Sequence, residues 1–205
     1  MGHSDSAVSS DPVQQRQCAG ATEPAGGSRL SGLPPVAGPG TRLLLLGSFP
    51  GAASLAARQY YAHPRNQFWP LLSELLGVDL RALSYARRLR CLRARGLGLW
   101  DVYGACERRG SLDANIRCAS PNDLQVLVRR LPRLQGIAHN GGESARSLRI
   151  TRDLAPRSWR LPSSSPANAS WSFERKLAAW REVFDACGLL HDAARLPAGS
   201  TLGGS

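Results

Sequence analysis

Lysine is almost absent from this chain of 205 residues: Lys176 is the one example, and arginine supplies nearly all of the 26 basic residues. Acidic residues are also few, at 15, so the formal net charge is +11. An excess of positive charge favours an anionic partner, and nucleic acid is the first candidate. The competing interpretation is compositional, because a G+C-rich genome raises arginine, alanine, glycine and leucine together without functional meaning.

No segment approaches the length of a membrane span, and the N-terminus has neither the basic region nor the apolar stretch of a secretion signal. The five cysteines are odd in number and include no Cys-x-x-Cys pair, which disfavours a zinc site and a disulfide framework. We therefore expect free thiols in a reducing compartment, no metal and no other cofactor, and a soluble cytoplasmic protein without membrane contact.

The length suits one domain. Residues 1–38 are rich in Ser, Gly, Pro and Ala with little apolar periodicity, which predicts a disordered leader that is dispensable for chemistry. The folded domain is expected over residues 39–192, and a flexible tail over residues 193–205.

Apolar runs and helical periodicity alternate along the folded part. Buried strands are predicted over residues 43–46, 97–102, 135–140 and 159–161, and helices over 66–76, 79–94, 124–131, from about 143, and over 172–187. Residues 104–123 are interpreted mostly as loop with one helical turn. Alternation of this kind predicts an α/β fold, a three-layer α/β/α sandwich with a mainly parallel central sheet.

Polar segments follow the ends of these predicted strands, after Gly47, after Asp101 and after Asn140. A fourth segment, PSSSPAN at residues 162–168, is too rich in proline for regular structure and is called the Ser-Pro loop below. Ligands of open α/β sheets bind at the carboxyl ends of the strands, so these four segments are the candidate site. The Gly-x-Ser-x-Gly elbow, the Gly-Lys phosphate loop and the His-Glu-x-x-His motif are all missing from the sequence, which disfavours serine hydrolases, kinases and metalloproteases.

Two motifs carry a resemblance to a known family: GSFPG at residues 47–51 and YAHPRNQFW at residues 61–69. They resemble the uracil-DNA glycosylase superfamily, with the hypoxanthine-DNA glycosylase branch closest and the mismatch-specific uracil branch also similar. LWDV at 99–102, NGG at 140–142 and LPSSSPAN at 161–168 extend the resemblance over residues 40 to 187. It implies a uracil-DNA glycosylase-like fold and hydrolysis of the N-glycosidic bond of a flipped deaminated base, hypoxanthine first, leaving an abasic site.

Phe49 stands where other superfamily members carry an Asp or Asn that positions the attacking water. An aromatic ring cannot orient water in that way. The resemblance to the hypoxanthine branch singles out Asn66 as the catalytic residue instead, and an amide can both accept from water and donate to developing charge. Capping of the following helix is the alternative role of Asn66, and both roles can hold together.

The resemblance also implies a set of base-binding residues. Tyr61 matches the aromatic that stacks on the extruded base, while Asp101 and Asn140 either read the base edge or order their own loops. His63 is expected to order its loop, with charge donation to the leaving base as the alternative. The full base-binding set is Gly47, Ser48, Phe49, Tyr61, Asp101 and Asn140.

The Ser-Pro loop replaces the family's second motif, which pinches the DNA backbone and sends a wedge into the duplex. Hydroxyls and backbone amides are suitable phosphate ligands. The expected DNA-binding residues are Arg65, Ser163, Ser164, Ser165, Pro166, Ala167, Asn168, Arg175 and Lys176. The partner implied is double-stranded or single-stranded DNA containing deaminated bases, bound by a monomer that acts at the bacterial nucleoid.

Two other functions stay open. Excision of uracil or mismatched thymine is the alternative within the same class. A non-catalytic binder of damaged DNA is the alternative from another class, and Phe49 at the usual water-positioning place is the feature that favours it.

Overall fold

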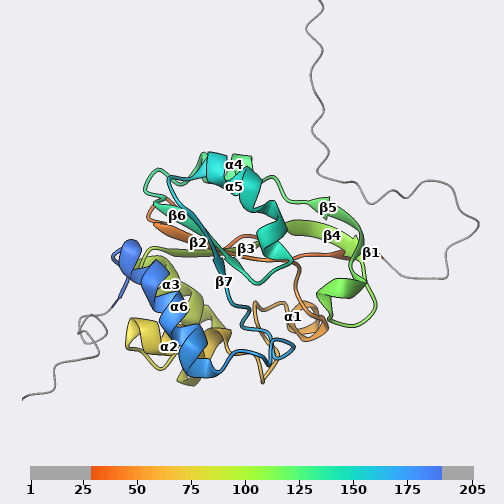
Figure 1. Ribbon diagram of the computed structural model, residues 1–205, viewed down its shortest axis with the longest axis horizontal. Helices are drawn as coiled ribbons and strands as arrows, with labels where there is room; N and C mark the ends of the chain where they lie inside the picture. Colours follow the sequence, from red (N-terminus) through yellow and green to blue (C-terminus); the bar gives the residue numbers. More distant parts are fainter. Residues whose placement is uncertain (1–28, 191–205) are drawn as a thin grey trace, which may run out of the picture.

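A computed structural model describes residues 29–190, and its centre is a four-stranded sheet in the order β3-β2-β6-β7 (Figure 1). Every neighbouring pair in this sheet is parallel. The strands are β2 (Leu43–Gly47), β3 (Leu97–Asp101), β6 (Gly136–Asn140) and β7 (Ser158–Leu161). The four strands and the parallel sheet predicted from the sequence are confirmed.

The four leucines of β2 hold the layers together, because successive side chains of a strand point to opposite faces. Leu43 and Leu45 pack into the apolar cluster built with Phe68 and Trp180. Leu44 and Leu46 pack into a second cluster on the other face. All four leucines are fully buried, so this short strand is apolar on both sides, as parallel strands between two helix layers are.

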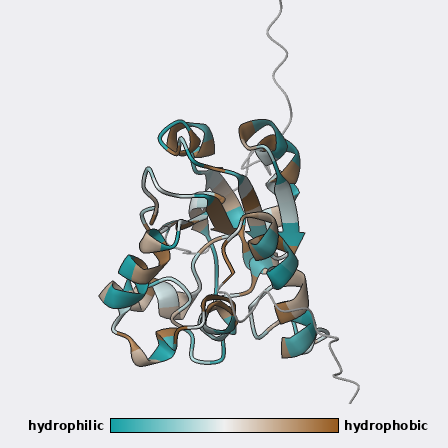
Figure 2. Ribbon diagram, turned by 90° about the vertical axis from the view of Figure 1, so that its left-hand side faces the viewer, coloured by the Kyte–Doolittle hydropathy of each residue, from teal (hydrophilic) through white to brown (hydrophobic). Residues whose placement is uncertain are grey.

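Helices cover both faces of the sheet, and strand segments coloured as hydrophobic lie between them in Figure 2. The helices α2 (Phe68–Leu76), α3 (Tyr85–Ala94) and α6 (Phe173–Ala186) lie on one face, and α4 (Leu124–Val128) and α5 (Leu148–Leu154) lie on the other. Shorter pieces are α1 (Ala52–Ala57), η1 (Leu80–Ala82), η2 (Asp113–Asn115) and η3 (Ser144–Ser147). The predicted three-layer sandwich is confirmed.

The helix predicted over residues 79–94 is two elements, η1 and α3. The Asp79 carboxylate accepts hydrogen bonds from the backbone N–H groups of Arg81 and Ala82, which closes the short 3-10 turn. Leu83 is then extended, with φ −88° and ψ 147°, and breaks the helical path before α3 begins. Local capping has therefore overridden the longer periodicity.

Residues 104–123, interpreted from the sequence as mostly loop, instead form a hairpin. Strand β4 (Tyr103–Glu107) pairs antiparallel with β5 (Arg117–Pro121), and β1 (Arg29–Ser31) pairs with the other edge of β4. Register shifts interrupt the pairing of β4 with β5, so the sequence shows no clean alternation of apolar and polar residues. Within the hairpin, η2 is the helical turn that the sequence predicted.

The leader predicted over residues 1–38 overlaps the fold. Besides strand β1, Val36 is buried and exchanges backbone hydrogen bonds of 2.8 Å with Leu99 of β3. The expectation is therefore wrong for residues 29–38. Residues 1–28 and the expected tail of residues 193–205 lie outside the described residues.

Cys91, Cys106 and Cys187 are free thiols, and the last two are buried. Cys118 is disulfide-bonded, so the expectation of free thiols is wrong for that residue. Among residues 29–190 no cluster of three or more His, Cys, Asp or Glu side chains could hold a metal ion. No helix in that same range combines the length and apolarity that a membrane span requires.

Candidate active site

A cavity of about 910 Å³ lies at the carboxyl ends of the central strands. The turn after β2, the end of β3, the end of β6 and the Ser-Pro loop after β7 all contribute to its wall, as the sequence led us to expect. The expected site residues that line it are Gly47, Ser48, Phe49, Tyr61, Asn66, Asp101, Asn140 and the whole of residues 163–168. Arg65, Arg175 and Lys176 are not among the lining residues.

Gly47 forms the floor of the cavity and has no room for a side chain. A Cβ atom there would collide with the Asp101 carboxylate and lie 3.3 Å from the Tyr61 hydroxyl oxygen. The turn is tied to the chain after β3, because the N–H groups of Val102 and Tyr103 donate to the carbonyl oxygens of Gly47 and Ser48 at 2.9 and 3.0 Å. Because residue 47 is glycine, the Asp101 carboxylate can occupy the space that a side chain would fill.

Asp101 is only 4% exposed, and its Oδ2 atom has no hydrogen-bond partner among the described residues. Burial raises the pKa of this carboxyl to about 8; nearby Asp113 raises it further, and Arg108 opposes the rise. The side chain is accordingly a neutral acid at pH 7. A neutral carboxyl can donate one hydrogen bond and accept others, whereas the ionised form only accepts.

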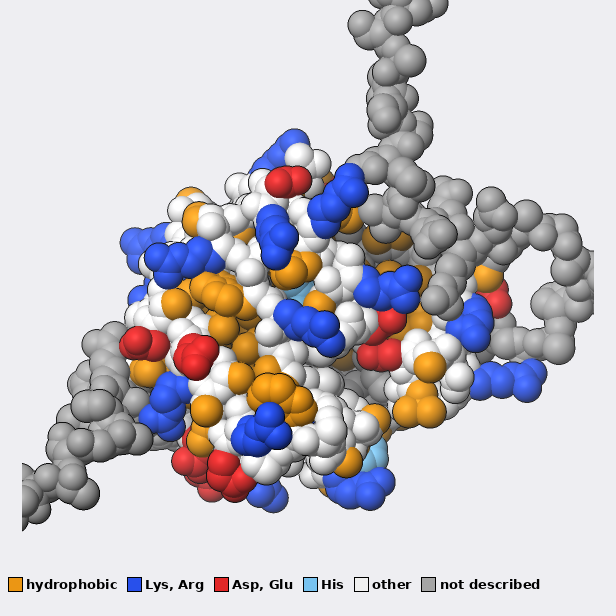
Figure 3. Space-filling view, in the orientation of Figure 1, with side chains coloured by type: hydrophobic (Ala, Val, Ile, Leu, Met, Phe, Trp, Pro, Cys, Tyr) orange, Lys and Arg blue, Asp and Glu red, His pale blue; other side chains and the backbone are white. Residues whose placement is uncertain are grey.

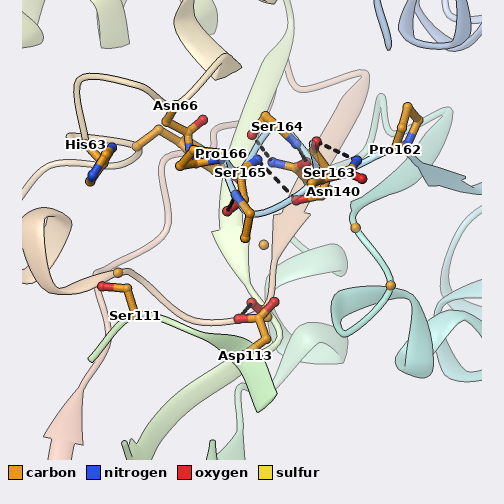
Figure 4. A pocket seen from close by; sticks show the side chains of 18 of the residues that line it. His63, Asn66, Ser111, Asp113, Asn140, Pro162, Ser163, Ser164, Ser165 and Pro166 are labelled. Carbon is orange, nitrogen blue, oxygen red and sulfur yellow. Dashed lines mark hydrogen bonds between the residues drawn. The ribbon is translucent and has the colours of Figure 1, made fainter. Parts of the chain in front are cut away.

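Asp113 was not expected from the sequence, because its segment was interpreted as loop. It comes from η2 in the β4–β5 connection, and its Oδ1 accepts a 2.7 Å hydrogen bond from the Ser48 hydroxyl. Figure 4 shows Asp113 and Ser111 across the cavity from Asn140 and the Ser-Pro loop. The polar run RGSLDAN at residues 109–115 is the only sequence signal for this wall.

Tyr61 is held rigidly beside the floor. Its ring stacks on Phe68 of α2 with the ring centroids 3.7 Å apart and the planes at 13°. Its backbone φ of 54° is in the left-handed region, which is uncommon for a tyrosine. Burial, with a further contribution from Asp101, raises the pKa of the hydroxyl above its usual value. One face of the Tyr61 ring is therefore already covered by Phe68.

Asn66 lines the cavity and also bonds the start of α2. Its Oδ1 accepts a 2.9 Å hydrogen bond from the N–H of Phe68, the first residue of α2, although the N-cap position itself is Gln67. This bond uses one lone pair of the Asn66 amide oxygen. The second lone pair and the amide N–H groups take no part in it. His63 orders this loop: its carbonyl oxygen accepts from the Asn66 N–H at 2.9 Å, and its Nδ1 accepts from the Arg65 N–H at 3.2 Å.

Asn140 and Ser164 hold one another through a reciprocal pair of hydrogen bonds. Asn140 Nδ2 donates to Ser164 Oγ at 2.9 Å, and the Ser164 N–H donates to Asn140 Oδ1 at 2.8 Å. Ser164 is 1% exposed, which corrects the expectation that it contacts phosphate directly. The Asn140 amide therefore clamps the Ser-Pro loop to the end of β6.

Lys176 is buried beneath the same loop, with 2% of its surface exposed. Its ammonium donates to the Gln67 side-chain oxygen at 2.8 Å and to the Asn168 carbonyl oxygen at 2.9 Å, and burial lowers its pKa. This corrects the expectation that Lys176 binds phosphate directly. The one lysine of the chain instead supports the loop from below.

Hydrogen bonds between residues close in sequence fix the conformation of the rest of the Ser-Pro loop. The hydroxyls of Ser163 and Ser165 accept from backbone N–H groups two residues further on, and Asn168 donates to the Ser163 carbonyl oxygen at 3.1 Å. Pro166 and Ala167 form the exposed apex. Exposed Arg65 and Arg175 lie outside the cavity, and the Arg175 guanidinium covers the Trp171 ring at 4.5 Å.

Known proteins match the chain over the central sheet and all the segments that line the cavity. The family model described as the uracil DNA glycosylase superfamily matches residues 34–185. Hypoxanthine DNA glycosylases of Methanosarcina barkeri (strain Fusaro / DSM 804) and Methanosarcina acetivorans are 38% and 36% identical over 153 residues, which is 75% of this chain and 96% of each relative. The solution NMR structure of a candidate uracil DNA glycosylase from M. acetivorans has a TM-score of 0.70 at 34% identity, and the match covers 78% of this chain and 99% of that one.

Proposed function

The chain belongs to the uracil DNA glycosylase superfamily, and from that premise we propose that it is a monofunctional DNA glycosylase that excises hypoxanthine. It hydrolyses the N-glycosidic bond of a flipped deaminated base and leaves an abasic site. The observation that carries the proposal is the cavity floor, where the buried Asp101 carboxyl and the stacked Tyr61 ring meet over Gly47. The named activity of the two curated relatives supports hypoxanthine as the base.

A neutral Asp101 suits the edge that deamination creates. Hypoxanthine presents a carbonyl oxygen beside a ring N–H, and a protonated carboxyl can donate to the first while it accepts from the second. Such a pair uses both carboxyl oxygens, and the Oδ2 atom of Asp101 is buried with no hydrogen-bond partner among the described residues. Uracil carries the same combination of groups, so uracil excision is the second candidate, and the name of the matched NMR structure supports it.

Bond cleavage ahead of water attack explains how a site without a strong base can act. The sugar gains positive charge while the base departs with negative charge, so positioning and electrostatics carry most of the rate. Asn66 places the attacking water through the lone pair that the bond to α2 leaves unused. Lys176 is buried and already hydrogen-bonded, so it is not available as a Schiff-base nucleophile, and the reaction ends at the abasic site.

The DNA is held by charge and by the Ser-Pro loop. Arginine side chains are spread over the face shown in Figure 3, in keeping with the net charge of +11. Arg65, Arg175 and the exposed part of the loop contact phosphates on either side of the flipped nucleotide. Flipping is required because a glycosidic bond inside a stacked duplex is inaccessible. The enzyme works on this DNA as a monomer in the cytoplasm.

A lesion panel tests the proposal. Purified protein is incubated with duplexes and single strands that carry hypoxanthine, uracil, xanthine or a T·G mismatch, and abasic sites are revealed with alkali. We expect hypoxanthine strands to be cleaved fastest. Failure to release any of these bases would refute the enzyme, and tight lesion-specific binding without release would select the non-catalytic binder.

A further inference from the structure

Residues 108–113, called the hairpin apex here, form the wall of the cavity that faces the Ser-Pro loop. Ser111, Leu112 and Asp113 all line the cavity. In Figure 4 the side chains of Ser111 and Asp113 lie on the side opposite Ser163, Ser164 and Ser165. The cavity therefore lies between these two walls.

The hairpin apex is fixed in place although it lies at the surface. Ser111 Oγ accepts from the Ala52 N–H at 2.9 Å, and the Ser48 hydroxyl donates to Asp113 at 2.7 Å. The Arg108 guanidinium donates to the carbonyl oxygen of Pro50. All three bonds join the apex to the turn after β2 or to the start of α1, so the wall and the cavity floor form one unit.

Leu112 projects from this fixed backbone with 57% of its surface exposed. Among residues 29–190 the exposed large hydrophobic side chains are Leu112, Val126, Ile150 and Trp171, and Leu112 and Trp171 are the two that line the cavity. Exposed apolar area costs about 25 cal/mol per Å² relative to burial. Covering this rigidly held leucine with bound DNA would therefore lower the free energy of the complex.

Flipping a nucleotide leaves a gap in the base stack, and proteins fill such gaps with apolar side chains such as leucine. The apex of the Ser-Pro loop offers only the short side chains of Pro166 and Ala167, and the Asn168 side chain is engaged with Ser163. We propose that Leu112 is the wedge that enters the duplex beside the flipped nucleotide, from the wall opposite the Ser-Pro loop. This inference rests on the proposed base-flipping function.

Trp171 is the rival side chain on the rim. The Arg175 guanidinium already covers its ring at 4.5 Å, and it lies on the Ser-Pro side of the cavity, three residues after Asn168. Insertion of Trp171 would require this cation–π contact to open. Leu112 has no such contact to give up.

The test compares Leu112→Ala with Leu112→Met and with the matched control Ile150→Ala, which removes another exposed apolar side chain, 41% exposed and away from the cavity. Single-turnover release of hypoxanthine is measured from a duplex and from the same lesion strand alone. Unstacking costs a few kcal/mol per step, so we expect Leu112→Ala to lower the duplex-to-single-strand rate ratio roughly 10- to 100-fold. Leu112→Met should restore most of the ratio, and Ile150→Ala should keep the wild-type value.

A second readout keeps this test separate from the proposed function. With 2-aminopurine next to the lesion, wild-type protein should raise its fluorescence on binding, and Leu112→Ala should not. If wild-type protein releases no base, the proposed function fails, while the fluorescence still decides the wedge. A rate ratio and a fluorescence change that Leu112→Ala leaves at wild-type levels would overturn the wedge, as would their loss in Trp171→Ala alone.

Discussion

On one side of the cavity, the Ser-Pro loop satisfies most of its polar groups within the protein: Asn140 clamps Ser164, and Lys176 holds the loop from below. On the other side, the floor and the hairpin apex leave an unpartnered oxygen on Asp101 and an exposed leucine. The first wall is therefore held in one shape by bonds within the protein. The second wall has unused bonding capacity and unused apolar surface, which suits reading and replacing a base.

Asn66 lies beside the Ser-Pro loop (Figure 4), and its removal should have the largest effect. Asn66→Ala should lower hypoxanthine release by about 10²-fold or more, because a positioned amide near the reacting centre is lost. The same change removes the hydrogen bond that Asn66 accepts from the first N–H of α2 and should lower the free energy of unfolding by about 1 kcal/mol.

Asn66→Ser is the matched control, because the serine hydroxyl can still accept from the first N–H of α2. It should recover stability in thermal unfolding without recovering the single-turnover rate. A wild-type rate in either variant would remove Asn66 from catalysis.

The floor should respond to pH in a direction set by Asp101. Its folded pKa of about 8 lies above the usual range of aspartate, so the folded state binds the extra proton and stability is lost as pH rises toward 8. Asp101→Asn cannot ionise, so its free energy of unfolding relative to wild type should increase between pH 5.5 and 8.5. Urea unfolding at three pH values measures this difference. A pH-independent difference would show that Asp101 is ionised in the folded protein.

Variants of Arg65 and Lys176 should distinguish direct contact with phosphate from support of the Ser-Pro loop. Arg65→Ala should weaken DNA binding and reduce the slope of log K against log salt by about 1, because one phosphate contact is lost. Lys176→Met should weaken binding through a loosened loop and leave that slope at its wild-type value. Titration at several salt concentrations distinguishes the two, and a reduced slope for Lys176→Met would contradict its supporting role.

The smallest effect is expected inside that wall. Ser164→Ala removes the hydroxyl that accepts from Asn140 and should cost about 1 kcal/mol of stability. Ser170→Ala, at an exposed position beside the loop, should stay within about 0.5 kcal/mol of wild type in the same urea titration. Equal values for the two variants would show that the reciprocal clamp adds no stability.

The central sheet and the location of the site could be predicted because their signals are local. A run of four leucines ended by glycine specifies a strand buried on both faces, and polar residues after each strand end must meet at one edge of a parallel sheet. The hairpin wall could not be predicted in this way. Its strands are short, their register shifts, and the third strand, β1, comes from a segment whose composition is typical of disorder.

The burial of polar side chains, like the hairpin wall, could not be predicted from the sequence. The family's second motif suggested that Ser164 contacts phosphate, and nearness along the chain suggested the same of Lys176. Their hydrogen-bond partners, Asn140 and Gln67, are 24 and 109 residues away. Only the folded arrangement shows that these side chains are used inside the protein. The sequence did not predict Asp113 as a cavity residue for the same reason, because its hydrogen bond with Ser48 joins residues 65 positions apart.

Release of free hypoxanthine under single-turnover conditions tests the central claim most directly. Purified protein is mixed in excess with a hypoxanthine-containing duplex and with a matched adenine-containing duplex, and the released bases are quantified by mass spectrometry. The account predicts free hypoxanthine and an equal amount of abasic sites from the first duplex, and no release from the second. Intact hypoxanthine strands after prolonged incubation, with the protein bound to them, would contradict it.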